Sequence, residues 1–223
     1  MFGSIRLIIY DLDGVLINSD KAILESFKRT MAELGEPFKP NMIKDRIGHN
    51  LYQIFRDTMS HEYYDRVEEL RQIYIKHFQS LEIACITLLP DVHETLTKLS
   101  DRGFLQSVAT NKAVSEAERI LSNLGVDDHF DLIAGFMTVD KPKPEPDMIH
   151  YILEKLEVNP IQAVFVDDTN VGLTAGIRAG VNTIGITTGN NTLDEIKSVN
   201  PDMIINRISM LPEIIVKNTQ VDR

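Results

Sequence analysis

Two aspartates, Asp11 and Asp13, directly follow a run of apolar residues that begins at Ile5 and is interrupted only by Arg6. Such a run is typical of a buried parallel strand, and its carboxyl end is where open α/β sheets bind their ligands. Two carboxylates this close together repel each other unless a cation or a shared proton compensates their charge. The sequence therefore predicts a divalent metal site at the end of this strand.

Polar residues also follow three later predicted strands, which span residues 104–110, 132–136 and 163–166. Thr110 and Asn111 end the first of these, Lys143 comes shortly after the second, and Asp167 and Asp168 follow the third. The carboxyl ends of parallel strands meet at one edge of a sheet. We therefore expect these side chains to surround the same point as the first acidic pair.

This set of side chains suits phosphoryl transfer. Several carboxylates can hold one Mg²⁺, which prefers oxygen ligands, and lysine, threonine and asparagine can bind the remaining phosphate oxygens. An aspartate near the phosphorus can attack it and form an acyl phosphate, while a second carboxylate protonates the leaving oxygen and then activates water. Phosphoryl transfer depends mainly on such positioning and charge compensation.

The pattern of helices and strands predicts two domains. From residue 17 to residue 84 the apolar spacing is helical, including a long helix over 61–81, and no strand is evident. After a helix with a capping-box-like start at 90–94, strands and helices alternate, which indicates a parallel sheet with right-handed crossovers. We expect a doubly wound α/β core formed by residues 1–16 and 85–223, an inserted α-helical cap domain at 17–84, and a frayed tail from residue 218.

Composition restricts the setting of the protein. The chain has 223 residues and a net charge of −10, which argues against nucleic-acid binding and leaves a small anionic substrate open because a metal can invert the local charge. No stretch suits a membrane span or a secretion signal, and Cys85 is the only cysteine, so we expect a cytoplasmic protein without an intrachain disulfide. We expect a monomer or homodimer.

Four segments of the chain resemble the motifs of the haloacid-dehalogenase-like phosphohydrolases, in the order found in that family. They are Asp11-Leu12-Asp13-Gly14-Val15-Leu16, Thr110-Asn111, Lys143-Pro144-Glu145-Pro146-Asp147 and Val166-Asp167-Asp168-Thr169-Asn170-Val171-Gly172. The resemblance implies a catalytic core with a Rossmann-like fold, Mg²⁺ as cofactor and a helical cap that closes over the site. The inserted helical segment matches the position of that cap.

The resemblance also implies a role for each of these residues. Asp11 would be the nucleophile and a metal ligand, and Asp13 would be the general acid and base, with its backbone carbonyl on the metal. Asp168 would bind the metal, with Asp167 helping directly or through water. Lys143 would neutralise the nucleophile and the phosphate.

The substrate would then be bound by core and cap residues. Thr110 and Asn111 would hold the transferring phosphoryl group, next to Gly14. Arg46 and His49 in the cap would meet the leaving group, although an ordinary connection between helices explains this polar loop equally well. Lys141 is the alternative to Lys143, which fits the third motif better.

Departures from the family pattern bear on the subgroup. The fourth motif often reads GDxxxD, whereas Asp167 here replaces the glycine and Gly172 replaces the last acid. An acidic pair followed by a glycine at this position also occurs in the sugar-phosphate mutases of the family, so this motif alone does not select a subgroup. Asp13 argues against a dehalogenase, and Ile23 argues against a sugar-phosphate mutase, which would have a histidine there. The motifs look most like those of phosphoglycolate phosphatases and their pyrophosphatase relatives, with a sugar-phosphate phosphatase or phosphomutase as alternatives.

A signalling receiver domain is the alternative from a different class of protein. Receivers also combine an acidic pair, a phospho-accepting aspartate, a threonine or serine and a lysine on a doubly wound sheet. Their accepting aspartate lies on a later strand than the acidic pair, whereas the predicted strand at 132–136 has no aspartate at its end. The inserted helical segment also has no counterpart in a receiver.

Overall fold

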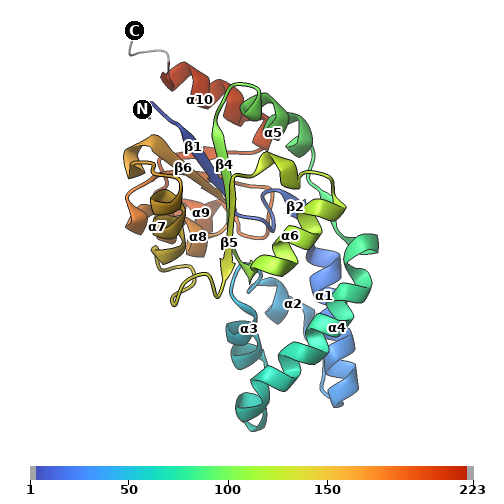
Figure 1. Ribbon diagram of the computed structural model, residues 1–223. Helices are drawn as coiled ribbons and strands as arrows, with labels where there is room; N and C mark the ends of the chain where they lie inside the picture. Colours follow the sequence, from blue (N-terminus) through green and yellow to red (C-terminus); the bar gives the residue numbers. More distant parts are fainter. Residues whose placement is uncertain (1–3, 220–223) are drawn as a thin grey trace.

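Six parallel strands form the central sheet of the computed structural model, which describes residues 4–219 (Figure 1). The strands are β1 (Leu7–Tyr10), β4 (Leu105–Ala113), β5 (Leu132–Phe136), β6 (Ala163–Asp167), β7 (Asn182–Ile186) and β8 (Met203–Ile205). Their order across the sheet is β5-β4-β1-β6-β7-β8, with β1 paired to both β4 and β6. This order brings the ends of β4, β1 and β6 side by side, and the predicted doubly wound sheet is confirmed.

Helices cover both faces of the sheet (Figure 1). One face carries α5 (Val92–Ser100), α6 (Val114–Asn123) and α10 (Leu211–Thr219), and the other carries α7 (Asp147–Lys155), α8 (Asn170–Ala179) and α9 (Leu193–Ser198). Side chains alternate along β1. Ile8 and Tyr10 pack on the face covered by α5, α6 and α10, and Leu7 and Ile9 pack on the opposite face. Both faces of the strand are therefore apolar, as its unbroken hydrophobic run predicts.

A separate group of helices lies beyond the carboxyl edge of the sheet (Figure 1). It consists of α1 (Asp20–Leu34), α2 (Pro40–Lys44), α3 (Leu51–Thr58), the 3₁₀ helix η1 (His61–Arg66) and α4 (Val67–Cys85). The rings of Phe27 and Tyr74 lie 4.7 Å apart between α1 and α4, and Phe55 of α3 packs against both. We call these helices the cap.

Two details of the cap differ from the sequence prediction. The helix expected over 61–81 is a 3₁₀ helix up to Arg66 and an α-helix from Val67 to Cys85. The two segments that connect the core to the cap also contain short strands. One is β2 (Ile17–Asn18), which pairs antiparallel with β3 (Thr87–Leu88) in the other. A ladder of two residues per strand is too short to leave a periodic pattern in the sequence.

The core differs from the prediction at three further places. Asp91, the N-cap residue before α5, has a left-handed φ of 66°, and its side chain forms no capping hydrogen bond. The expected capping box therefore does not form. Strand β4 continues beyond Thr110 to Ala113, with a shift in its register against β5 after Ala109. Helix α10, which the sequence analysis missed, extends to Thr219; the rest of the predicted tail, 220–223, lies outside the described residues.

Three short 3₁₀ helices complete the core: η2 (Asp127–His129), η3 (Pro160–Gln162) and η4 (Ile208–Met210).

Within residues 4–219, no helix is long and apolar enough to cross a membrane.

Candidate active site

Three buried aspartates meet at the carboxyl edge of the sheet. Asp11 follows β1, while Asp167 ends β6 and is followed by Asp168, and all three residues are at most 3% exposed. One carboxylate oxygen from each lies within 4.8 Å of the others. The structure thus brings together the two acidic motifs, because β1 and β6 are neighbours in the sheet.

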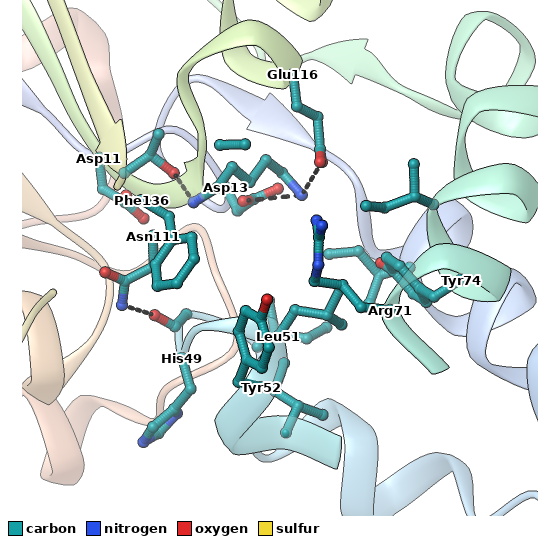
Figure 2. Close-up of a pocket in the computed structure, with 18 residues that line it drawn as sticks. Asp11, Asp13, His49, Leu51, Tyr52, Arg71, Tyr74, Asn111, Glu116 and Phe136 are labelled. Atoms are coloured by element: carbon teal, nitrogen blue, oxygen red, sulfur yellow. Dashed lines mark hydrogen bonds and ion pairs between the residues drawn. The ribbon is translucent and has the colours of Figure 1, made fainter. Parts of the chain in front are cut away.

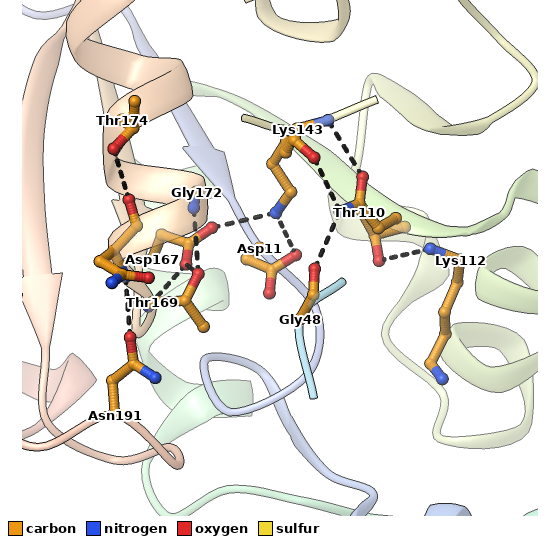
Figure 3. A network of polar contacts seen from close by, with 12 residues as sticks. Asp11, Gly48, Thr110, Lys112, Lys143, Asp167, Thr169, Gly172, Thr174 and Asn191 are labelled. Carbon is orange, nitrogen blue, oxygen red and sulfur yellow. Dashed lines mark hydrogen bonds and ion pairs between the residues drawn. The ribbon is translucent and has the colours of Figure 1, made fainter. Parts of the chain in front are cut away.

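Lys143 supplies the positive charge in this cluster. Its Nζ donates hydrogen bonds to Asp11 Oδ1 at 2.7 Å and Asp167 Oδ2 at 3.0 Å (Figure 3). Burial alone would lower the pKa of Lys143, but the two carboxylates outweigh it and the pKa is raised. The other candidate, Lys141, is exposed. The choice of Lys143 over Lys141 agrees with this geometry.

The cluster has more negative than positive charge. Three carboxylates and one ammonium give a formal charge of −2 when all are ionised, which one divalent cation would neutralise. Without such an ion, burial raises the pKa of Asp11 to about 7, with Lys143 opposing the shift and Asp167 and Asp13 adding to it. Burial also raises the pKa of Asp168, and Asp167 and Asp11 add to that shift.

Asp168 has a buried carboxylate oxygen without a hydrogen-bond partner within residues 4–219. Among the described residues, its Oδ1 is the buried side-chain oxygen or nitrogen without a hydrogen-bond partner, while Oδ2 accepts from the backbone N–H of Asn190 at 3.2 Å. A buried acceptor without a partner is costly, and a metal ion would satisfy it. Gly14 and Gly189 pack so closely that a Cβ on either would clash with this carboxylate, at 2.5 Å and 1.7 Å from Oδ2. The donor set therefore fits a hard divalent cation.

Asp13 lies in a different environment from the three buried aspartates. Its Oδ1 accepts a short hydrogen bond from Ser19, and its Oδ2 lies 3.5 Å from Lys112 Nζ. Lys112 also lies 3.2 Å from Glu116, and the two carboxylates raise the pKa of Lys112 although burial opposes this. The carboxylate of Asp13 is not part of the three-aspartate group. The two acids of the first motif are therefore held by different partners.

The second motif links the core to the cap. Asn111 Nδ2 donates to the carbonyl of Gly48 at 2.8 Å, and Asn111 Oδ1 accepts from the backbone N–H of Lys143 at 3.2 Å. Gly48 has a φ of +102° and lies against Thr169, whose Cγ2 would be 3.0 Å from a Cβ at that position. The side chain of Thr110 is buried beside these groups. The cap loop is therefore held against the core in this structure.

The structure separates the two predicted cap residues. His49 lines the pocket between cap and core, but its ring points away from Asp11 and Asp13 (Figure 2). Arg46 does not line that pocket, since its guanidinium donates to the carbonyl of Met42 at 2.9 Å and lies 3.4 Å from Asp57. The structure does not bring Arg46 to the site.

Several residues of the site were not identified from the sequence. Lys112 and Glu116 surround Asp13, Ser19 bonds to it, and Arg71 and Tyr52 line the cap side of the pocket. Lys112 directly follows the second motif, and this adjacency was the signal available in the sequence. The cap residues carry no such signal, because helix spacing alone does not show which residues face the core.

The sequence matches the haloacid dehalogenase-like hydrolase family over residues 8–186. It is 32% identical to a phosphoglycolate phosphatase of Aquifex aeolicus over 80% of this chain and 83% of that protein. It is 27% identical to the pyrophosphatase PpaX of Bacillus cereus over 95% of this chain and 96% of that one.

A solved structure of a haloacid dehalogenase-like hydrolase from Streptococcus pneumoniae superimposes with a TM-score of 0.85, at 28% identity and with 95% and 98% of the two chains covered. These similarities do not support the receiver alternative, and they agree with the hydrolase motifs at the strand ends. The chain belongs to the haloacid dehalogenase-like hydrolase family and is a phosphohydrolase.

Proposed function

We propose that this protein is a Mg²⁺-dependent phosphatase of small phosphorylated metabolites that works through an aspartyl phosphate on Asp11. The observation that carries the proposal is the cluster of Asp11, Asp167 and Asp168 with one lysine and an unpartnered Asp168 oxygen. When bound, Mg²⁺ would supply positive charge beside the phosphoryl oxygens, held by Asp11, Asp168, the Asp13 carbonyl and Asp167 directly or through water.

Asp11 is the nucleophile in this mechanism. Lys143 holds its Oδ1, whereas Oδ2 accepts no hydrogen bond from the described residues and is available for attack. An oxygen of Asp11 would form a bond to phosphorus while the bond from phosphorus to the leaving oxygen breaks. Lys143 and the hydroxyl of Thr110 would compensate the charge on the phosphoryl oxygens.

Asp13 carries the proton in both steps. In the first step its protonated carboxyl gives a proton to the leaving oxygen. In the second, the carboxylate takes a proton from a water that attacks phosphorus, and the bond between phosphorus and Asp11 breaks to release phosphate. Ser19 and Lys112 hold the two oxygens of Asp13 and fix its orientation during these transfers.

The cap excludes bulk water during this reaction. The contacts of Gly48 with Asn111 and Thr169 close the cap loop over the core. Excluding water protects an acyl phosphate from uncontrolled hydrolysis and strengthens the electrostatic interactions inside the site. The substrate must enter before this closure, so the cap has to open between turnovers.

The similarity to phosphoglycolate phosphatases favours a phosphomonoester like phosphoglycolate as the substrate, with pyrophosphate and sugar phosphates as alternatives. Phosphate release from a panel of these compounds with and without Mg²⁺ tests the proposal, and we expect repeated turnover only with the metal. The variant Asp11→Asn should abolish turnover while circular dichroism shows an unchanged fold. Turnover by that variant at the wild-type rate would exclude Asp11 as the nucleophile.

A further inference from the structure

Arg71 is a cation in the pocket that the mechanism above does not use. The pocket has a volume of about 90 Å³ and extends from Asp11 and Thr110 in the core to Tyr52 and Arg71 in the cap. Figure 2 shows the guanidinium of Arg71 reaching from α4 toward the side of the pocket where Glu116 and Asp13 lie. Arg71 is thus on the leaving-group side of the site, opposite the cluster that would bind the phosphoryl group.

The orientation of Arg71 is fixed by its neighbours. Its Nε and Nη2 bind the two oxygens of Glu68 at 2.9 and 2.7 Å, and its guanidinium lies 5.8 Å from the ring centre of Tyr52. Tyr52 is held in turn by a hydrogen bond to Glu68 and by Phe136 of the core, whose ring centre is 5.6 Å away. A guanidinium held in this way loses little conformational entropy when it binds a further group.

Arg71 retains hydrogen-bonding capacity. A guanidinium has five N–H donors, and Glu68 uses two of the nitrogens of Arg71. Among the described residues, Nη1 has no hydrogen-bond partner, although the side chain is only 26% exposed. Lys112, the other cation of the pocket, is already engaged by Asp13 and Glu116. Of these two cations that line the pocket, Arg71 is therefore the one with a free N–H donor group.

The size of the pocket limits what Arg71 could bind. A volume of about 90 Å³ corresponds to about six to nine water molecules. This space accommodates a phosphorylated acid of two or three carbons, whereas a nucleotide would need the cap to stay open. A group that reaches Arg71 while its phosphate is next to Asp11 would therefore be small.

We propose that Arg71 binds an oxyanion carried by the leaving group of the substrate and so makes the enzyme prefer small phosphate compounds whose leaving group carries its own anionic group. The guanidinium matches the geometry of both a carboxylate and a second phosphate. This inference rests on the proposed phosphatase function and names its substrate class. It concerns recognition only, since Arg71 lies in the cap and the bond-making residues are in the core.

The test compares three substrates with different leaving groups: 2-phosphoglycolate, pyrophosphate and glycerol 3-phosphate, whose leaving group is uncharged. For the variant Arg71→Met we expect kcat/KM for phosphoglycolate, pyrophosphate or both to fall about ten- to a hundredfold, mainly through KM. With glycerol 3-phosphate the change should stay within about threefold, which also shows that the variant is folded. The pattern of loss identifies the anion as a carboxylate or a second phosphate.

Arg66, at the end of η1 and five positions before Arg71, provides a matched control. It forms an equivalent two-nitrogen contact with Glu69 and lies over Tyr63, but it does not line the pocket. The variant Arg66→Met should not change kcat/KM for any of the three substrates. The variant Arg71→Lys, which keeps the charge but loses the fork, should retain an intermediate preference.

The two proposals fail in different ways. If the wild-type enzyme hydrolyses these compounds but Arg71→Met lowers kcat/KM for charged and uncharged leaving groups equally, or for neither, Arg71 does not recognise the leaving group and the phosphatase function stands. A wild-type preference for glycerol 3-phosphate over both phosphoglycolate and pyrophosphate would overturn the inference in the same way. Absence of Mg²⁺-dependent phosphate release from any ester would overturn the proposed function itself.

Discussion

The carboxylate of Asp167 occupies the space that a side chain at position 172 would need: a Cβ built on Gly172 would lie 1.7 Å from Asp167 Oδ2. Asp167 ends β6 and Gly172 lies in the first turn of α8, so the strand and the helix compete for one small volume. In the GDxxxD pattern the glycine and the acid stand at the opposite positions. The structure explains the exchange, because only one of the two positions can carry a side chain.

This relationship predicts the effect of a small substitution. Gly172→Ala should reduce stability by about 1–3 kcal/mol and disturb the acidic cluster, because Asp167 is buried and has no space to move. Urea unfolding measures the loss of stability, and phosphate release measures the disturbance of the site. The second substitution Asp167→Gly should recover stability in the Gly172→Ala background, and a double variant less stable than Gly172→Ala would contradict the steric explanation.

Lys143 and Lys141 form a matched pair of lysines two residues apart, one buried in the acidic cluster and the other exposed. Lys143→Met leaves three buried carboxylates without a protein cation, so phosphate release should fall by at least about a hundredfold. Breaking a buried ion pair should also cost about 3–5 kcal/mol of stability in metal-free protein. Lys141→Met should alter neither quantity, and equal effects of the two substitutions would argue against the role of Lys143.

The raised pKa of Asp11 predicts a pH dependence of the stability of the metal-free protein. Burial raises this pKa from 3.8 to about 7, so between these values the folded protein holds a proton that the unfolded chain has lost. The stabilisation of the folded protein by Asp11 is therefore fully present below pH 3.8 and is lost as the pH rises through about 7.

Comparison with Asp11→Asn isolates this contribution, since asparagine does not titrate. In EDTA, the stability of wild-type protein relative to the variant should fall as the pH increases from about 4 to about 7. Saturating Mg²⁺ should reduce this slope, because a bound cation favours the ionised carboxylate. Urea unfolding at several pH values, in EDTA and in saturating Mg²⁺, measures the two pH dependences. A stability difference that does not change with pH in EDTA would contradict the shifted pKa.

Arg119 joins the core to the cap. From α6 it binds both carboxylate oxygens of Glu82 in α4, at 2.6 and 2.9 Å, and Glu82 is only 5% exposed. Arg119→Met would leave this buried carboxylate unpaired, so we expect a loss of about 1–3 kcal/mol in urea unfolding. The exposed pair of Arg29 and Glu25 within α1 is the control, and Arg29→Met should cost at most about 0.5 kcal/mol. Equal costs would mean that the contact between cap and core adds no more stability than an exposed ion pair.

Local sequence patterns predicted the regular elements well where one face of an element is buried. The continuous apolar runs before Asp11 and Asp167 predicted buried strands, and the strand at 132–136 has the predicted bounds. The predictions were wrong where tertiary contacts decide the backbone. The break of the long cap helix at Val67 and the pairing of Ile17–Asn18 with Thr87–Leu88 are examples.

The sequence by itself determined the fold class and the set of groups that gather at one edge of the sheet, because parallel strands deliver their carboxyl ends to a common edge whatever the packing around them. Only the tertiary structure decided how these groups pair. Lys143 contacts Asp11 across 132 positions of the chain, and the Asp13 carboxylate lies beside Lys112. Arg71 enters the pocket because α4 packs over the core. Such contacts depend on the relative placement of whole elements, and no local spacing encodes that placement.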